Sequence, residues 1–278
     1  MNVQDFDFIA RLLKETSGLV LGKDKAYLLE SRLNPVARKW QFKGFDELAE
    51  AVRLGKEKAL IQDVTEAMTT NESFFFRDTK PFDQFRDVVL PHLLEARASS
   101  RSFRIWSAAC SSGQEPYSLA MILKEAEAKL NGWRIEILAT DLSTEILQKA
   151  QEGLYSQFEV QRGLPINFLV KYFKQDGDRW LVNDEIRRMV KFQTFNLLES
   201  PARFGKFDVV FCRNVLIYFD QDTKGQVLGG ISELMPDDGF LYLGGAETVL
   251  GITDKFQLVP GQRGLYGLTA GAAKSAVA

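Results

Sequence analysis

The sequence predicts an α/β protein in which a small helical module precedes a mostly parallel sheet of about seven strands. In residues 1–68, apolar side chains such as Phe6, Ile9 and Leu13 recur at helical spacing, without strand-like alternation. From residue 103 onward, short apolar runs alternate with longer amphipathic segments. This alternation is typical of a parallel sheet whose strands are joined by helices.

Five apolar runs account for the parallel strands. They lie within residues 103–109, 133–141, 189–198, 206–219 and 239–247. The segments 115–130, 143–153 and 221–235 have the spacing of helices, and Pro116 suits the first turn of its helix. Two short runs around a Pro-Gly turn in 255–268 predict a terminal antiparallel hairpin. The last ten residues, small and polar, predict a disordered tail.

The connection between the second and third strands is unusually long, at about 45 residues. It contains YFKQDGDRWLV at 172–182, two apolar-rich runs around an Asp-Gly turn, which favours a hairpin. We therefore expect residues 155–190 to form an inserted antiparallel subdomain.

The composition excludes several classes of protein. The chain has 278 residues, with 35 basic against 37 acidic side chains, so it lacks the basic excess of a dedicated nucleic-acid binder. No apolar run approaches the roughly 20 residues that span a bilayer, and the amino terminus has no signal-peptide pattern. Two cysteines and one histidine make a disulfide framework and a zinc site improbable. We expect a cytoplasmic protein without a metal or a histidine proton shuttle.

The loop after the first strand has the composition of a ligand-binding turn. Residues 107–113 are all small, so a ligand could approach the backbone closely. The loop lacks both the G-x-G-x-x-G pattern of dinucleotide sites and the Gly-Lys-Ser/Thr pattern of triphosphate sites. Asp141, which ends the second strand, could accept hydrogen bonds from ribose hydroxyls. The alternative is that Asp141 caps the helix that follows.

Two further segments carry polar residues that could serve a site. Residues 69–82 (TTNESFFFRDTKPF) are aromatic and charged, which indicates a domain interface or a ligand lid; the alternative is a hydrophobic hinge with Arg77 and Asp78 solvated. The fourth strand runs into Arg213 and Asn214 at its carboxyl end, the edge where open α/β sheets bind ligands. Asn196 ends the third strand at the same edge. Taken singly, each asparagine could be a turn residue.

Five motifs in order resemble one known family over nearly the whole chain. The segments NESFFFRD, AACSSGQEPYS, ATDLS, FNLL and FCRNVLIYF are similar to those of the CheR family of chemotaxis receptor glutamate methyltransferases. The resemblance implies a seven-stranded Rossmann-like methyltransferase domain that depends on S-adenosylmethionine, with a small inserted β-subdomain and a preceding all-helical domain. It implies a helical receptor-docking domain over 1–68, a linker over 69–82 that contributes to the cofactor site, and a methyltransferase domain over 83–278.

The resemblance also implies a set of site residues. S-adenosylmethionine has no phosphate to bind, which would explain the missing glycine and lysine patterns. The residues implied to bind it, or its product S-adenosylhomocysteine, are Asn71, Ser73, Arg77, Glu115, Asp141, Asn196, Leu197, Arg213 and Asn214. Arg77 and Tyr218 are the implied contacts to the reacting groups. Some relatives have Thr at Ser73 and Glu at Gln114, so Gln114 receives less weight.

The implied acceptor is a glutamate on the cytoplasmic helical bundle of a transmembrane chemoreceptor. A free glutamate has a pKa of about 4.3 and is already a nucleophile at neutral pH, so no general base is required. In some relatives the β-subdomain binds a receptor's carboxyl-terminal peptide, which is a second possible contact here. No nucleic-acid partner and no membrane insertion are expected, and the enzyme would be recruited from the cytoplasm to receptor arrays.

A basic face on the helical module could dock an acidic receptor surface. Its residues are Lys23, Lys25, Arg32, Arg38, Lys39 and Lys43. The alternative is an ordinary solvated face, because Asp24, Glu30 and Glu47 are interspersed. Two further functions stay open: a methyltransferase of the same fold with another acceptor, and a non-catalytic scaffold that binds the cofactor. The presence of Arg77, Asp141, Asn214 and Tyr218 counts against the scaffold.

Overall fold

A computed structural model describes residues 3–269 of the chain. The chain divides into two compact units. The first comprises the residues up to Thr70 together with Tyr218–Lys224, and the second comprises Asn71–Ile217 and the residues from Gly225 onward. The predicted tail lies, apart from Thr269, outside the described residues.

The first unit is built from helices, as the spacing of its apolar residues predicts. These are α1 (Val3–Ser17), α2 (Ala26–Lys39), α3 (Phe45–Leu54) and α4 (Lys58–Met68), with a short 3₁₀ turn η1 (Lys23–Lys25). One apolar face of each helix enters a common core, in which Ile9, Leu33 and Val64 are fully buried. Burial of such faces, rather than helix propensity, stabilises helices of this length.

The second unit contains the predicted seven-stranded sheet. Its strands are β1 (Ser102–Ala108), β2 (Arg134–Asp141), β6 (Val190–Thr194), β7 (Val209–Cys212), β8 (Phe240–Leu243), β9 (Phe256–Leu258) and β10 (Leu265–Leu268). They lie in the order β6-β2-β1-β7-β8-β10-β9. The first five are parallel, and β10 pairs antiparallel with both β8 and β9. The five parallel strands and the terminal hairpin are confirmed.

Helices connect the strands and precede the sheet. They are α5 (Lys80–Gln84), the π-helical turn η2 (Phe85–Val89), α6 (Leu90–Ala96), α7 (Gln114–Glu125), α8 (Thr144–Glu152) and α12 (Gln221–Glu233), with 3₁₀ turns η3 (Pro201–Phe204) and η4 (Leu216–Tyr218). Helix α7 is buried over most of its length, from Gln114 to Leu123, because it lies within the core of this unit. Its amino terminus therefore starts in a buried environment directly after the small-residue loop.

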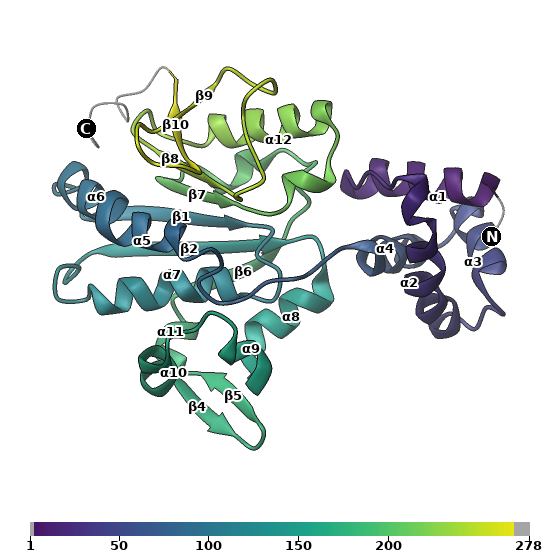
Figure 1. The fold of residues 1–278 in the computed structure, drawn as a ribbon, viewed down its shortest axis with the longest axis horizontal. Coiled ribbons are helices and arrows are strands. Elements are labelled where there is room, and N and C mark those ends of the chain that lie inside the picture. Colours follow the sequence, from purple (N-terminus) through teal and green to yellow (C-terminus); the bar gives the residue numbers. More distant parts are fainter. Residues whose placement is uncertain (1–2, 270–278) are drawn as a thin grey trace. The chain divides into compact units, whose positions relative to one another are not determined.

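The predicted insertion forms a lobe of its own below the main sheet in the view of Figure 1. Its three strands, β3 (Leu154–Ser156), β5 (Arg179–Val182) and β4 (Phe173–Asp176), form an antiparallel sheet with β5 in the centre. Three short helices complete it: α9 (Gln157–Gln161), α10 (Ile166–Tyr172) and α11 (Asp184–Arg187). The hairpin over 172–182 is confirmed, whereas β3 and the three helices were not predicted.

The three consecutive phenylalanines of the linker lie in different environments. Phe75 and Phe76 are buried, and Phe75 packs edge-on against Tyr155 and Phe173 of the insertion at 5.0 and 5.5 Å between ring centroids. Phe74 is only partly buried and lies between two guanidinium groups, 5.5 Å from that of Arg77 and 4.4 Å from that of Arg162. The linker is therefore anchored to the insertion by its aromatic residues.

Candidate functional site

The site residues converge because three strands lie side by side. β1 pairs in parallel with β2 on one side and with β7 on the other, and Ala108 is in register with both Thr140 and Cys212. The loops that follow these strands therefore leave the sheet at one edge, the edge where ligands bind in open α/β sheets. These loops carry the predicted Asp141, Arg213 and Asn214.

The loop after β1 adopts a conformation that points its backbone inward. Ala109, Ser111 and Gly113 all have positive φ, at 58°, 50° and 91°. At Gly113 a Cβ atom would lie 3.0 Å from the Cβ of Ala150 and 3.2 Å from the hydroxyl of Tyr155, so this position favours glycine for space and for conformation. The Tyr155 hydroxyl donates to the Ser112 carbonyl at 2.6 Å. The insertion thus fixes the loop.

Asp141 joins the loops after β1 and β2. Its side chain is buried, and its Oδ2 accepts from the Ser111 amide at 2.8 Å while its Oδ1 accepts from the Ser143 amide at 3.1 Å. Ser143, rather than Asp141, caps α8, because the Ser143 Oγ accepts from the Ile146 amide. The helix-cap alternative for Asp141 is therefore wrong. Each carboxylate oxygen carries two lone pairs, so one carboxylate can accept from several donors at once.

A buried charge network lies beside this loop. The Arg213 side chain, 1% exposed, donates to Glu115 Oε2 at 3.0 Å, to Asp78 Oδ2 at 2.7 Å and to the Arg77 carbonyl at 3.0 Å. Glu115 Oε1 accepts from the Ser107 hydroxyl at 2.9 Å. Asp78 is therefore paired and not merely solvated. Because a guanidinium this buried needs partners, the network ties the linker to β7 and α7.

The linker carries three of the predicted residues, Asn71, Ser73 and Arg77. The Asn71 carbonyl accepts from the Ser111 hydroxyl at 2.8 Å, and Arg77 Nη1 donates to the Glu72 carbonyl at 2.8 Å. Ser73 is partly buried. Phe76, Asp78 and Thr79 have φ of 52°, 69° and 49°, which is unusual for residues other than glycine. Such strained positions persist only where surrounding contacts hold them, here Arg213 and the Ser118 hydroxyl, which accepts from the Phe76 amide.

The two predicted asparagines occupy turns, as their alternative interpretation anticipates. Asn196 Oδ1 accepts from the Leu198 amide at 3.1 Å, and Asn214 has a left-handed backbone with φ of 60°. Sequence reasoning missed Glu247, whose carboxylate accepts from the amides of Asn214 and Val215 at 2.8 and 2.9 Å. It also missed Tyr155. Nothing in their local sequence distinguishes either residue from an ordinary surface glutamate or core tyrosine.

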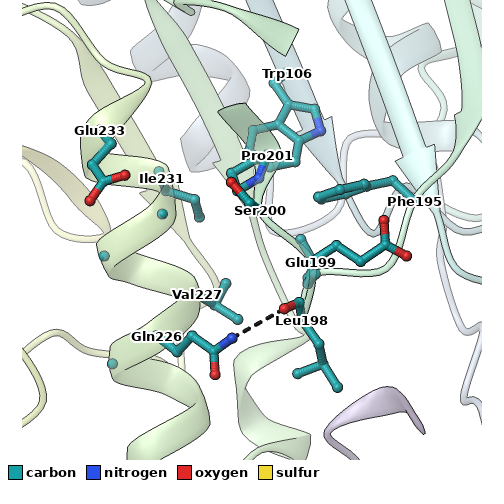
Figure 2. Close-up of a pocket in the computed structure, with 14 residues that line it drawn as sticks. Trp106, Phe195, Leu198, Glu199, Ser200, Pro201, Gln226, Val227, Ile231 and Glu233 are labelled. Carbon is teal, nitrogen blue, oxygen red and sulfur yellow. Dashed lines mark hydrogen bonds between the residues drawn. The ribbon is translucent and has the colours of Figure 1, made fainter. Parts of the chain in front are cut away.

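A cavity of about 290 Å³ lies between the loop after β6 and α12. Figure 2 shows Gln226 and Val227 of α12 opposite Leu198 and Glu199, and the Gln226 amide donates to the Leu198 carbonyl at 3.1 Å. Leu197 is the one predicted site residue among those that line it. This cavity is therefore separate from the network around Asp141, Glu115 and Arg213.

The buried thiols do not supply a nucleophile. Burial, reinforced by the carboxylates of Asp141 and Glu115, raises the pKa of the Cys110 thiol well above its ordinary value. Burial likewise raises the pKa of Cys212. Both side chains therefore stay neutral near pH 7, and a thiol needs its thiolate form to attack. In the described part of the chain, no cluster of His, Cys, Asp and Glu could hold a metal ion.

Tyr218 belongs to the first unit, in the short segment that groups with the helices. It is partly buried, and its carbonyl accepts from the Val20 amide at 2.9 Å. In the same segment, Asp220 forms an ion pair with Lys14 at 2.6 Å, which raises the pKa of Lys14 and lowers that of Asp220. Tyr218 is the one predicted site residue that lies in this unit; the other nine lie in the second.

The basic face predicted on the helical unit is partly used for internal contacts. Arg32 donates to the carbonyls of Met68 and Thr69 at 2.8 and 2.9 Å, and Lys39 pairs with Asp63 at 2.7 Å. Arg32 therefore neutralises the carboxyl-terminal end of α4, where backbone carbonyls lack helical partners. Its replacement would affect folding as well as any docking.

Comparison with known proteins gives two family matches that together span most of the chain. Residues 4–69 match the family described as "CheR methyltransferase, all-alpha domain", and residues 71–265 match "CheR methyltransferase, SAM binding domain". "Chemotaxis protein methyltransferase 1" of Pseudomonas aeruginosa is 43% identical over 92% of this chain and 94% of its own length. "Chemotaxis protein methyltransferase" of Vibrio parahaemolyticus is 40% identical over 92% and 93%, and that of Borreliella burgdorferi is 35% identical over 91% and 92%.

Proposed function

This chain belongs to the CheR methyltransferase family, and we propose that it transfers the methyl group of S-adenosylmethionine to glutamate carboxylates of chemoreceptors. The products would be glutamate methyl esters and S-adenosylhomocysteine, and the biological role would be sensory adaptation. The observation that carries the proposal is the match over more than nine-tenths of the chain to relatives named as chemotaxis protein methyltransferases.

The chemistry of the site suits the cofactor of this family. The loop over 109–113 has no basic side chain, and its small residues leave the backbone open, so it suits an uncharged ribose better than a phosphate. The Asp141 carboxylate lies at the end of β2, the position from which an acidic residue would accept hydrogen bonds from ribose hydroxyls. The buried carboxylate of Glu115 could accept from the ammonium of the methionine portion.

The remaining cofactor residues would surround these two carboxylates. Asn71, Ser73 and Arg77 of the linker, together with Arg213 and Asn214, would line the methionine side of the pocket. Asn196 and Leu197 would flank the adenine. Among these, Arg213 acts mainly by holding Glu115 and the linker, through the contacts that it already makes.

The proposed reaction demands little acid–base chemistry from the chain. When bound, S-adenosylmethionine supplies a methyl group on a positively charged sulfur, and the neutral thioether departs. A glutamate acceptor is ionised at neutral pH, which agrees with a chain that has one histidine, at position 92, packed against Phe240. The task of the protein is alignment, which can contribute roughly 7–11 kcal/mol. Arg77 would guide the acceptor carboxylate and Tyr218 would orient it.

The partner would be the helical bundle of a chemoreceptor, docked on the helical unit. Arg38 and Lys23 are the basic residues most suited to this role, since Arg32 and Lys39 make internal contacts. A carboxyl-terminal receptor peptide on the inserted sheet would be a second contact. Charge reversal at Arg38 should weaken receptor methylation more at low salt than at high salt, because salt screens exposed charges.

The proposal is tested with methyl-labelled S-adenosylmethionine and membranes that contain chemoreceptors from the same cell. We expect label in the receptor band and its release as methanol in mild base, because carboxyl methyl esters are labile there. Label that resists base would indicate a different acceptor atom. Tight cofactor binding without any transfer to receptors would contradict the proposed substrate and favour another acceptor.

A further inference from the structure

Glu247 follows β8 and gathers four backbone amides on a single carboxylate. Its Oε2 accepts from Gly244 at 2.6 Å and from Asn214 at 2.8 Å. Its Oε1 accepts from Val215 at 2.9 Å and from Ile217 at 3.3 Å. Three of these four donors belong to the turn after β7, so one side chain from the neighbouring strand satisfies most of the amides of that turn.

The turn could not keep this shape without an acceptor. Asn214 has φ of 60°, a conformation that is costly for residues other than glycine, and it directs successive amides toward one point. Backbone amides that converge on one point attract an anion. Without an acceptor, these amides would repel one another and lack hydrogen bonds. The Glu247 carboxylate supplies the acceptor, with the added strength of charge-assisted hydrogen bonds.

The backbone at Gly244 lies so close to Asn214 and Glu247 that it leaves no room for a side chain. At Gly244, a Cβ atom would lie 2.7 Å from Asn214 Nδ2 and 2.7 Å from Glu247 Oε2. Any side chain at Gly244 would therefore push apart the turn and the carboxylate that holds it. The close approach joins the ends of β7 and β8, which are adjacent parallel strands.

We propose that Glu247 is a positioning residue for the cofactor site. It holds the turn that begins at Arg213 and Asn214, and so fixes the backbone from which both side chains extend. Glu247 acts through this turn and touches no reacting group. The inference rests on the proposed function only in that Arg213 and Asn214 bind the cofactor; it does not depend on which acceptor is methylated.

The test measures S-adenosylhomocysteine binding by calorimetry, without any acceptor. Glu247→Gln keeps the size of the side chain but replaces one carboxylate oxygen by an NH2 group, which would face the backbone N–H groups as a second donor. We expect its affinity to fall by roughly tenfold to a hundredfold, the range for loss of charge-assisted hydrogen bonds. Glu95→Gln, at an exposed glutamate on α6, is the matched control and should bind as the parent does.

Chemical rescue separates positioning from a general loss of structure. In Glu247→Ala, the amides are left without their carboxylate, and Glu247 is accessible enough for a small anion to reach them. Sodium acetate should restore much of the lost affinity, whereas sodium chloride at the same ionic strength should not. Parent-like affinity in Glu247→Gln would overturn the proposal. So would a weakened Glu247→Ala variant that acetate does not improve. If the binding results are as expected but the receptor is not methylated, only the proposed substrate is contradicted, and the role of Glu247 stands.

Discussion

Asp141 uses both carboxylate oxygens to hold main-chain amides, and it is also the proposed acceptor for ribose hydroxyls. Asp141→Asn removes the negative charge and places the side-chain NH2 group near a main-chain N–H group, so that two donors face each other. We expect the affinity for S-adenosylhomocysteine to fall at least about tenfold, through loss of charge-assisted hydrogen bonds. Calorimetry measures this directly. Asp178→Asn, in the exposed turn of the insertion, should leave the affinity unchanged; equal affinities for the two variants would contradict the role of Asp141.

Tyr218 has a separate proposed role, in orienting the acceptor. Tyr218→Phe should lower kcat about tenfold or more while leaving cofactor affinity within about twofold, since only the hydroxyl is removed. Steady-state kinetics with receptor membranes give kcat, and calorimetry gives the affinity. If both fall by the same factor, Tyr218 acts on the cofactor and not on the acceptor.

At the scale of elements, the inserted sheet contacts both the loop after β1 and the linker. Tyr155 in β3 donates to the Ser112 carbonyl, and its ring packs on Phe75 of the linker. Gly163 follows α9, has φ of 85°, and would place a Cβ atom 2.1 Å from the Phe75 carbonyl oxygen. Arg162 pairs with Glu72 at 2.6 Å. The insertion therefore braces the linker and the loop after β1, which are two of the segments near the predicted cofactor residues.

Tyr155→Phe tests this bracing. It leaves the Ser112 carbonyl buried without its donor, which typically costs about 1–3 kcal/mol. We expect weaker S-adenosylhomocysteine binding, measured by calorimetry, together with a lower unfolding midpoint. Tyr172→Phe is the matched control, because the Tyr172 hydroxyl bonds Glu125 on α7, away from the loop. It should lower stability without changing cofactor affinity; a similar loss of affinity in both variants would refute the specific role of Tyr155.

The elements also show what the sequence could and could not predict. The buried strands are recognisable because apolar residues cluster in short runs. The hairpin of the insertion is recognisable because Asp-Gly favours a turn, although the structure places the turn at Gly177 and Asp178, with Asp176 still paired in β4. Strand β3 was missed because three residues carry too little periodicity. Ser111, Asp78 and Asn214 have left-handed backbones that only tertiary contacts impose, so no local pattern reveals them. The motifs name candidate site residues, which stay predictions, but they do not reveal the partners that position these residues.

At the scale of the whole molecule, stability should depend on pH through partly buried ion pairs. Arg97 donates to Asp238 at 2.6 Å and to Asp208 at 2.8 Å, and its hydrogen bond lowers the pKa of the Asp238 carboxyl. A carboxyl whose pKa is lower in the folded state than in the unfolded state stabilises the fold at pH values above its unfolded pKa of about 3.9. This stabilisation is lost as the pH falls through the pKa of the folded state.

Asp238→Asn should therefore destabilise the protein by about 1.5–3 kcal/mol at pH 7, the range for hydrogen bonds to charged groups. The difference in the free energy of unfolding between this variant and the parent should shrink as the pH falls below about 4, because the parent carboxyl then becomes protonated and loses its charge too. Denaturant unfolding at a series of pH values measures it. Asp87→Asn is the control, because Asp87 pairs with Arg86 on the surface and should contribute less than about 1 kcal/mol. A pH-independent difference for Asp238→Asn would contradict the ion-pair explanation.

No helix in residues 3–269 is long and apolar enough to cross a membrane. In the proposed reaction, the helical unit would dock the receptor and the α/β unit would bind the cofactor.

The most direct test of the central proposal locates the transferred methyl group on a single residue. A purified cytoplasmic chemoreceptor fragment is incubated with the enzyme and S-adenosylmethionine, and its peptides are sequenced by tandem mass spectrometry, with the Asp141→Asn variant as a parallel control. We predict a methyl group on glutamate side chains, greatly reduced with the variant. Methylation of another residue type, or an unmodified fragment when the enzyme is shown to bind the cofactor, would contradict the proposal.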